Sequence, residues 1–454
     1  MGNAKKGRPF GFYVCALGFT FERCAFYTVK YLLAMWIATE ALAGGLGLTD
    51  VEGAAVSASF VAWTYITPLI GGYIADRFIS PRICVALGMI LMGAGYLVAW
   101  RATSLSMVWV MIVLVAIGTG FFKGNLSGIN GLLFHSQDEL DSAFSIQYSF
   151  VNIGSFVGTT FIAILATTGL FGIKTSFNTV FLLCGLFLLF DAIWFIFVGG
   201  KALGEIGKVP FKKDQREFVH DENGKRRENA PLTAGDKKKI AAIILVTLFS
   251  VVFWMLWYMA YMPAYYYFGY GDGDSFLNKA NWMIGSFLVP TSWFDSVNAF
   301  ACMALGPVLA VVWAKLAARP KGDLSMYKKT ALGCGLLGVS YLVMVLANIV
   351  AGEGQCSVLW LALVCGLMSV GEMVFSPLGN SFISKLAPAK VLGLLLGFWP
   401  IAVFFSQKIY PTVYTWTTTQ DFNFAYGLLG GIVVVFGIVL WLLSGKLDVW
   451  AEEA

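Results

Sequence analysis

Three ionisable side chains lie inside an apolar stretch near the start of the sequence. Glu22, Arg23 and Lys30 fall within residues 10–41, which read FGFYVCALGFTFERCAFYTVKYLLAMWIATEA. A charged group at the centre of a membrane costs about 2.5–3.5 kcal/mol on insertion scales, so such groups are rare and usually functional. Buried cations in excess of their acids favour an anion that arrives and leaves. The planar guanidinium of Arg23 suits a carboxylate, which it can bind through two hydrogen bonds.

The spacing of these residues predicts how they project from a helix. Arg23, Tyr27 and Lys30 are spaced by four and three residues, so they share one helix face. Glu22 falls about 100° away, at an edge of that face. The alternative is a structural ion pair, for example between Glu22 and Lys123, that holds two helices together.

Other apolar stretches also carry polar groups that could contribute to such a site. They are Lys123, Asn125, Gln147, Tyr148, Asn152, Asp191, Asp295, Asn298 and Glu372. For Asp191, which lies near the end of its stretch, a structural or snorkelling role is favoured.

Long apolar segments must hold these side chains. The chain of 454 residues is 58% hydrophobic and only 13% charged, whereas soluble domains are about 25% charged. Twelve segments approach or exceed the roughly 20 residues that a membrane helix needs. Their approximate bounds are 10–41, 51–76, 82–101, 105–134, 140–170, 176–199, 239–269, 293–318, 327–350, 356–386, 389–411 and 423–445. The sequence therefore predicts an all-α membrane protein.

The positions of lysine and arginine predict the topology. Most of them fall in the N-terminal segment and in loops on its side of the membrane, which places both termini in the cytoplasm. The loops on the other side hold only Arg101, Lys174, Lys279 and Lys408. The net charge of +5 follows from this topology, so no nucleic-acid partner is expected. The first apolar run is too long for a cleavable signal peptide, and we expect it to remain as an anchor.

A charged segment divides the chain into halves. We expect an N-terminal six-helix bundle at 1–200, a cytoplasmic linker at 201–238 and a C-terminal six-helix bundle at 239–454. Two such halves are typical of transporters that rock about a central substrate site. A channel is less favoured, since no filter-like repeat occurs.

No motif indicates an enzyme, a metal site or a cofactor. The segment GTGFFKG at 118–124 is not GxGxxG and lies within a helix, where close packing explains its glycines. His135 and His220 are isolated. The eight cysteines contain no CxxC pair and lie mostly in apolar runs, so they are predicted to be small buried hydrophobes.

The segment GGYIADRFISPR at 71–82 contains the pattern G-x-x-x-D-R, which resembles a motif of the major facilitator superfamily. That resemblance implies that Asp76 and Arg77 help to gate the cytoplasmic side. The alternative is a basic loop that only sets topology.

Further segments resemble the proton-coupled oligopeptide transporter family. FTFERCAFY at 19–27 resembles its helix-one motif E-x-x-E-R-F-x-Y-Y, and GTGFFKGN resembles its helix-four motif G-T-G-x-x-K-P-N. YSFVNIGS at 148–155 resembles F-Y-x-x-I-N-x-G. In the second half, the matching segments are FWMLWYM at 253–259, DSVNA at 295–299 and GEMVFSPLGNSFISKLAP at 371–388. The matches follow the family's order over nearly the whole chain.

The resemblance implies the twelve-helix major facilitator fold and import of di- and tripeptides, with binding residues carried over by motif. It assigns the peptide carboxylate to Arg23 and Lys123, the amino group to Asn152, Asn298 and Glu372, the backbone to Tyr27 and Tyr65, and a lining position to Trp399. We expect a monomer in the plasma membrane, with peptide, protons and the lipid bilayer as partners.

Two acids of the family pattern are replaced. Phe19 stands for the first glutamate of the helix-one motif, and Tyr258 stands for the helix-seven acid. In the family these acids take part in proton coupling and in a gate that pairs with the cation corresponding to Lys30. Glu22 and Glu372 are the remaining candidates for proton coupling.

Three functions stay open at this stage. One is a peptide:proton symporter. A second is a family member with altered or absent coupling that carries peptides or another small carboxylate. A substrate-sensing receptor on a transporter scaffold is the third, although the chain has no large added soluble domain. Asp191 and Asp295 stay open as substitute proton sites.

Overall fold

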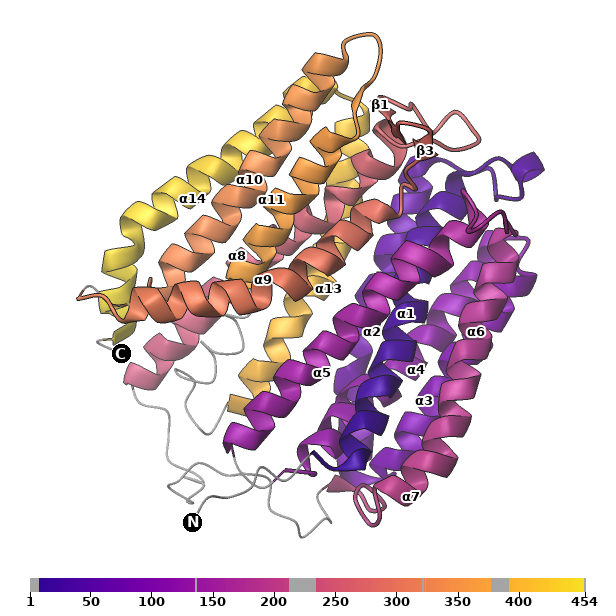
Figure 1. Ribbon diagram of the computed structural model, residues 1–454. Helices are drawn as coiled ribbons and strands as arrows, with labels where there is room; N and C mark the ends of the chain where they lie inside the picture. Colours follow the sequence, from indigo (N-terminus) through magenta and orange to yellow (C-terminus); the bar gives the residue numbers. More distant parts are fainter. Residues whose placement is uncertain are drawn as a thin grey trace. The chain divides into compact units, whose positions relative to one another are not determined.

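The computed structural model describes residues 8–134, 137–211, 234–320, 322, 324–376 and 392–452, and most of them are helical (Figure 1). Contacts divide the chain into two compact units. The first unit comprises residues 1–33 and 63–224, and the second comprises residues 34–62 and 225–454.

The first unit is built from long helices that continue, in two cases, through tighter or wider turns. α1 (Phe10–Ala38) and α2 (Asp50–Arg77) contribute the parts that belong to this unit. The other helices are α3 (Pro81–Arg101), α4 (Leu105–Gly131), α5 (Gln137–Val157), α6 (Phe177–Trp194) and the short α7 (Gly200–Ala202). α5 continues through η2 (Gly158–Ile162) and η3 (Ala163–Ala166), and α6 continues through η4 (Phe195–Gly199).

Glycines allow α4 to approach its neighbours closely. A methyl group on Gly120 would lie 2.8 Å from the carbonyl oxygen of Thr67 on α2, and one on Gly118 would lie 2.6 Å from that of Gly88 on α3. Real side chains do not tolerate such distances, so these crossings require glycine. The packing role predicted for the glycines of 118–124 is confirmed at these two positions.

The second unit is also mainly helical, with small strand pairs in its loops. Its helices are α8 (Ala234–Met259) with the turn η6 (Pro263–Tyr267), α9 (Trp293–Ala317), α10 (Met326–Ala351), α11 (Leu359–Phe375), α13 (Leu392–Thr418) and α14 (Phe422–Glu452), with the short η1 (Ala41–Ala43). β1 (Ala280–Asn281) pairs in parallel with β4 (Cys356–Ser357), and β2 (Met283–Ile284) pairs antiparallel with β3 (Phe287–Leu288).

Tyrosine side chains join the start of α2 and the end of α1 to the rest of the second unit. Tyr266 donates a hydrogen bond of 2.7 Å to the carbonyl of Ala34, and Tyr414 donates one of 2.7 Å to the carboxylate of Asp50. These bonds explain why residues 34–62 group with the second unit.

The helices have the length and surface of membrane spans. Within the described residues, nine helices are long and apolar enough to cross a membrane, and α11 is a shorter apolar helix. Within the described residues, the predicted apolar runs fall mainly on helices, and the run predicted at 239–269, for example, is helical from 234 to 267 apart from a single turn residue. Parts of the runs predicted at 356–386 and 389–411 lie outside the described residues.

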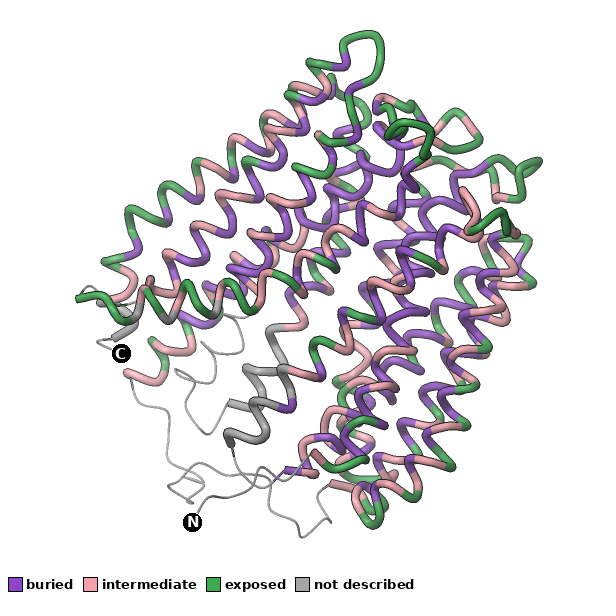
Figure 2. Tube along the Cα trace, in the orientation of Figure 1, coloured by how far each residue is buried: buried purple, intermediate pink, exposed green. Residues whose placement is uncertain are grey.

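Apolar side chains remain exposed along one side of these helices, where lipid would cover them. On α14 the exposed positions Ile432, Val435, Val439 and Leu442 are spaced by three and four residues, so they form one face. Figure 2 shows the same alternation of buried and exposed positions along the other helices. The eight cysteines are all buried, as predicted.

Candidate functional site

Glu22 and Arg23 form a bidentate ion pair on α1. The Nη2 and Nε atoms of Arg23 donate hydrogen bonds to the two carboxylate oxygens of Glu22. Both residues are buried, with 1% of Glu22 and 5% of Arg23 exposed. The guanidinium also lies 4.3 Å from the ring centroid of Phe26, in the range of a cation–π contact. The structural ion pair considered from the sequence therefore forms with Arg23 and not with Lys123.

Lys123 lies on α4 beside this pair. Its Nζ atom is 4.4 Å from the ring centroid of Tyr65 on α2, and it interacts electrostatically with Arg23 and Glu22. The close α2–α4 crossing sets this geometry, because Thr67 follows Tyr65 by two residues and donates a hydrogen bond of 2.6 Å to the carbonyl of Ala116. Together, Glu22, Arg23 and Lys123 carry an excess positive charge that a carboxylate can balance.

An aromatic contact occupies the position of the missing helix-one acid. Phe19 is 3% exposed, and its ring packs edge-on against that of Phe122 at 5.4 Å between centroids. Phe122 immediately precedes Lys123 in the chain. The substitution therefore replaces an ionisable group by an apolar link between α1 and α4.

Asn152 lies on a helix that packs against α1 beside Arg23. A methyl group on Gly154 of this helix would come within 3.1 Å of the Cβ of Arg23. Asn152 is 8% exposed, and its amide donates a hydrogen bond of 2.9 Å to the carbonyl of Tyr148, one turn earlier. Lys30, which is 4% exposed, places its Nζ 5.9 Å from the ring centroid of Tyr27.

In the second unit, the structure brings Asn298 and Glu372 together. The amide of Asn298, on α9, donates hydrogen bonds of 2.7 Å to Glu372 and 3.1 Å to Ser369, both on α11. Cys302 donates its thiol to the same carboxylate oxygen at 3.7 Å. This unit therefore holds a buried acid in a fixed orientation. On α8, Tyr258, which stands for the helix-seven acid of the family pattern, packs against Trp257.

The remaining predicted residues lie elsewhere. Arg77, at the end of α2, donates a hydrogen bond of 2.6 Å to the hydroxyl of Tyr73 one turn earlier, while Asp76 beside it is partly buried.

Trp399 lies on α13, and its side chain is outside the described part of the chain. Asn380 and the segment 377–391 are also outside it.

A comparison with family models decides the classification. The model described as Major Facilitator Superfamily matches residues 19–405. The chain belongs to the Major Facilitator Superfamily. The fold class predicted from the sequence, an all-α membrane protein of this superfamily with twelve membrane helices in two bundles, is thereby confirmed.

Relatives within the superfamily agree with the predicted resemblance to oligopeptide transporters. A di-/tripeptide transporter of Lactococcus lactis subsp. cremoris is 24% identical, over 96% of this chain and 95% of that protein. A dipeptide and tripeptide permease A of Erwinia pyrifoliae is 27% identical, over 86% of this chain and 82% of that protein. A crystal structure of a peptide transporter, POT, in complex with alafosfalin has the same fold, with a TM-score of 0.85, 22% identity and coverage of 99% of this chain and 97% of that one.

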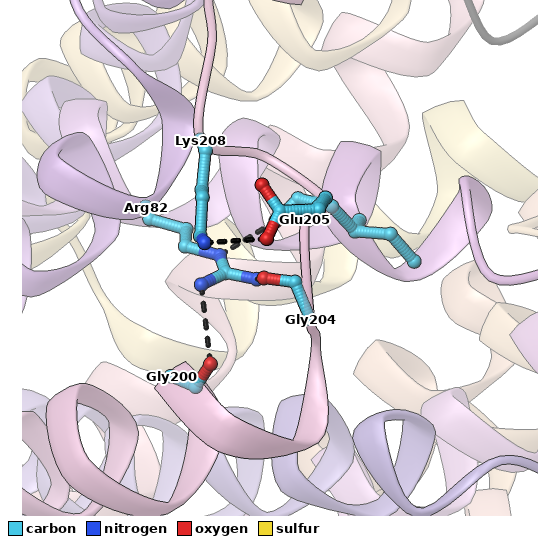
Figure 3. A network of polar contacts seen from close by, with 6 residues as sticks. Arg82, Gly200, Gly204, Glu205 and Lys208 are labelled. Carbon is cyan, nitrogen blue, oxygen red and sulfur yellow. Dashed lines mark hydrogen bonds and ion pairs between the residues drawn. The ribbon is translucent and has the colours of Figure 1, made fainter.

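Arg82, the last residue of the segment 71–82, is a further functional candidate. Its guanidinium donates hydrogen bonds to three backbone carbonyls, of Ile206 at 2.6 Å, Gly204 at 2.7 Å and Gly200 at 3.3 Å, beside the Glu205–Lys208 pair (Figure 3). Arg82 is the second residue of α3, and the carbonyls that it binds belong to residues that follow α6. It therefore fastens the segment after α6 to the start of α3, a contact that no sequence signal indicates.

A second contact missed from the sequence joins Tyr265 to Asp295. The hydroxyl of Tyr265, on η6, donates a hydrogen bond to the carboxylate of Asp295, at the start of α9. Both residues are buried. The sequence left Asp295 open as a substitute proton site, but it did not indicate Tyr265 as its partner.

Proposed function

We propose that the chain is a secondary active transporter that imports di- and tripeptides by alternating access, coupled to protons. The observation that carries this proposal is the opposite charge of two clusters of side chains, one in each unit. The first unit presents Arg23 and Lys123, and the second presents Glu372 held by Asn298. A short peptide is a zwitterion, so its two ends match these two charges. The names of the bacterial relatives support the same substrate class.

The residue roles follow from this matching of charges. Arg23 and Lys123 bind the carboxylate, Asn152, Asn298 and Glu372 bind the amino group, Tyr27 and Tyr65 contact the backbone, and Trp399 lines the site. Glu22 and Glu372 handle protons, and Lys30, Asp76 and Arg77 belong to the gates. The chain works as a monomer in the plasma membrane, with bundles at 1–200 and 239–454, a linker at 201–238 and both termini in the cytoplasm.

A second candidate function is transport without protons. The packing of Phe19 on Phe122 and of Tyr258 on Trp257 favours it, because aromatic groups fill two positions where the family has acids. Such a protein would carry peptides, or another small carboxylate, down their own gradient.

Uptake of a labelled dipeptide into proteoliposomes tests these proposals. The pH gradient is imposed or omitted while the membrane potential is held fixed. Accumulation above the outside concentration only with the gradient supports the proton symporter. Equilibration that ignores the gradient supports uncoupled transport. No uptake of any dipeptide by folded protein would contradict peptide transport and favour a different carboxylate.

A further inference from the structure

Asp191 is a buried acid that the proposed function does not use. It lies near the end of α6 and is 0% exposed. Within the described part of the chain, neither of its carboxyl oxygens has a hydrogen-bond partner. A methyl group on Gly18 of α1 would lie 3.6 Å from Oδ2 of Asp191, 3.4 Å from Met89 and 3.3 Å from Leu126. The carboxyl group therefore faces the backbone of α1 in apolar surroundings.

These surroundings determine the form of the acid. An ionised carboxylate that is buried without hydrogen bonds or a cation is strongly disfavoured, and the neutral acid avoids most of that penalty. A group of this kind inside a membrane helix is a site that can take up and release a proton.

Two ionisable groups of α1 act on Asp191. Cys15 and Glu22 interact electrostatically with it. Cys15, Gly18 and Glu22 are spaced by three and four residues, so they lie on one face of α1. Glu22 thus interacts with Asp191 while it pairs with Arg23.

Two side chains of α3, Arg82 and Tyr96, interact electrostatically with Cys15 and Glu22. Arg82 interacts electrostatically with Cys15, while its guanidinium donates to carbonyls that follow α6 (Figure 3). Tyr96 interacts with Glu22, with Arg23 and with Cys184 of α6.

We propose that Asp191 binds the coupling proton of the first unit, as the partner of Glu22, in a chain that has Phe19 in place of a family acid. This inference rests on the proposed function. The step is a simple ionisation: a proton from water adds to a carboxylate oxygen of Asp191, and the same proton leaves when Asp191 ionises.

Arg23 links this proton to the substrate. While Arg23 pairs with Glu22, it stabilises the negative charge beside Asp191. A substrate carboxylate that engages Arg23 weakens this stabilisation, and two ionised acids side by side repel each other. Asp191 then holds its proton more tightly. Substrate and proton therefore bind together, as symport requires.

The first test uses infrared spectroscopy and transport with the full chain. In wild type at neutral pH we expect the carbonyl stretch of a protonated carboxyl group, and we expect Asp191→Asn to lose it. In proteoliposomes, Asp191→Asn should lose accumulation driven by the pH gradient but keep exchange of labelled for unlabelled dipeptide at equal pH. Glu205→Gln, which removes an exposed acid after α6, should keep both activities.

The infrared measurement separates failure of this inference from failure of the proposed function. If wild type exchanges no dipeptide, peptide transport is wrong, while the carbonyl band still reports on Asp191. Gradient-driven accumulation in a folded Asp191→Asn variant, or an ionised Asp191 at neutral pH, would overturn the inference.

A second pair of variants applies if Asp191→Asn does not fold. Gly18→Ser offers Asp191 a hydroxyl donor, and Gly18→Ala adds the same carbon without the hydroxyl. A donor stabilises the ionised acid, so the carbonyl band should disappear at lower pH in Gly18→Ser than in Gly18→Ala. Identical titrations in the two variants would contradict a proton at this position.

Discussion

Asn298 and Glu372 are joined across α9 and α11 by a hydrogen bond of 2.7 Å between the Nδ2 atom of Asn298 and the Oε2 atom of Glu372. The same amide also reaches the hydroxyl of Ser369. The bond fixes the direction in which the carboxylate points. We propose that this oriented acid receives the positively charged end of the substrate.

Removal of the charge at this position should weaken peptide binding. Glu372→Gln keeps the size of the side chain but loses the charge that attracts an ammonium group. A hydrogen bond to a charged group contributes about 1.5–3 kcal/mol, or about 10- to 100-fold in Kd. Calorimetric titration of a dipeptide into the purified protein measures this loss. Ser369→Ala, which leaves Glu372 intact, is the control, and an unchanged affinity in Glu372→Gln would contradict the assigned role.

Lys123→Ala should weaken the preference for a free carboxylate. Lys123 contributes the excess positive charge of its cluster, and a carboxylate gains an interaction of about 1.5–3 kcal/mol from such a cation. Wild type should bind a dipeptide more tightly than the same dipeptide with an amidated C-terminus. In Lys123→Ala the ratio of the two affinities should fall, while Arg23 keeps a smaller preference. An unchanged ratio would place the carboxylate elsewhere.

Phe19→Glu should increase the proton dependence of uptake. It restores an ionisable group beside Glu22 and removes the packing against Phe122. Phe19→Gln has nearly the same size without the ionisable group, so it separates the proton effect from the loss of packing. The measurement is the ratio of uptake with and without a pH gradient. Equal ratios in the folded, active Glu and Gln variants would show that position 19 does not set the coupling.

The α2–α4 crossing should be sensitive to a single methyl group. Gly120→Ala would place Cβ 2.8 Å from the carbonyl of Thr67, and overpacking of this kind costs about 1–3 kcal/mol. Gly124, on the same helix, has nothing within 4 Å of its added Cβ. Gly124→Ala should therefore be stabilising by about 0.5–1 kcal/mol, since alanine is the better helix former. Thermal unfolding in detergent compares the two, and equal Tm values would argue against a tight crossing.

Arg82→Lys should loosen the segment that follows α6. A lysine keeps the charge but lacks the planar fork that reaches several carbonyls at once. Hydrogen exchange of the amides at 200–207 should become faster, while the core of α3 stays protected. Lys208→Ala, which removes only the exposed pair with Glu205, should leave the exchange nearly unchanged. Unaltered exchange in Arg82→Lys would show that the carbonyl contacts add little.

The helices could be predicted because a membrane span needs about 20 apolar residues, a requirement that is local in sequence. The points at which a helix changes to a tighter or wider turn could not be predicted. The run predicted at 140–170 begins at Gln137 and passes through the wider turn Gly158–Ile162 before it ends. A wider turn inserts one residue of the same apolar character, so composition and spacing give no sign of it.

The residues of the candidate site could be named from motifs, but most of their contacts could not. Helical spacing relates residues three or four apart, whereas Glu22 pairs with its immediate neighbour Arg23. Arg82 binds backbone carbonyls more than a hundred residues away, and a carbonyl has no sequence pattern. Asp191 looked structural from its place near a helix end, and only its buried, unpartnered oxygens suggest another role.

The burial of all eight cysteines has a practical consequence for experiments on motion. Thiol-reactive labels attack exposed thiolates, and buried thiols in apolar surroundings react poorly. A single cysteine introduced at an exposed position, such as Glu205 in the first unit or Arg319 in the second, would therefore be labelled against a nearly silent background. Spin or fluorescent labels on such a pair would report the distance between the two units during transport, without prior removal of the native thiols.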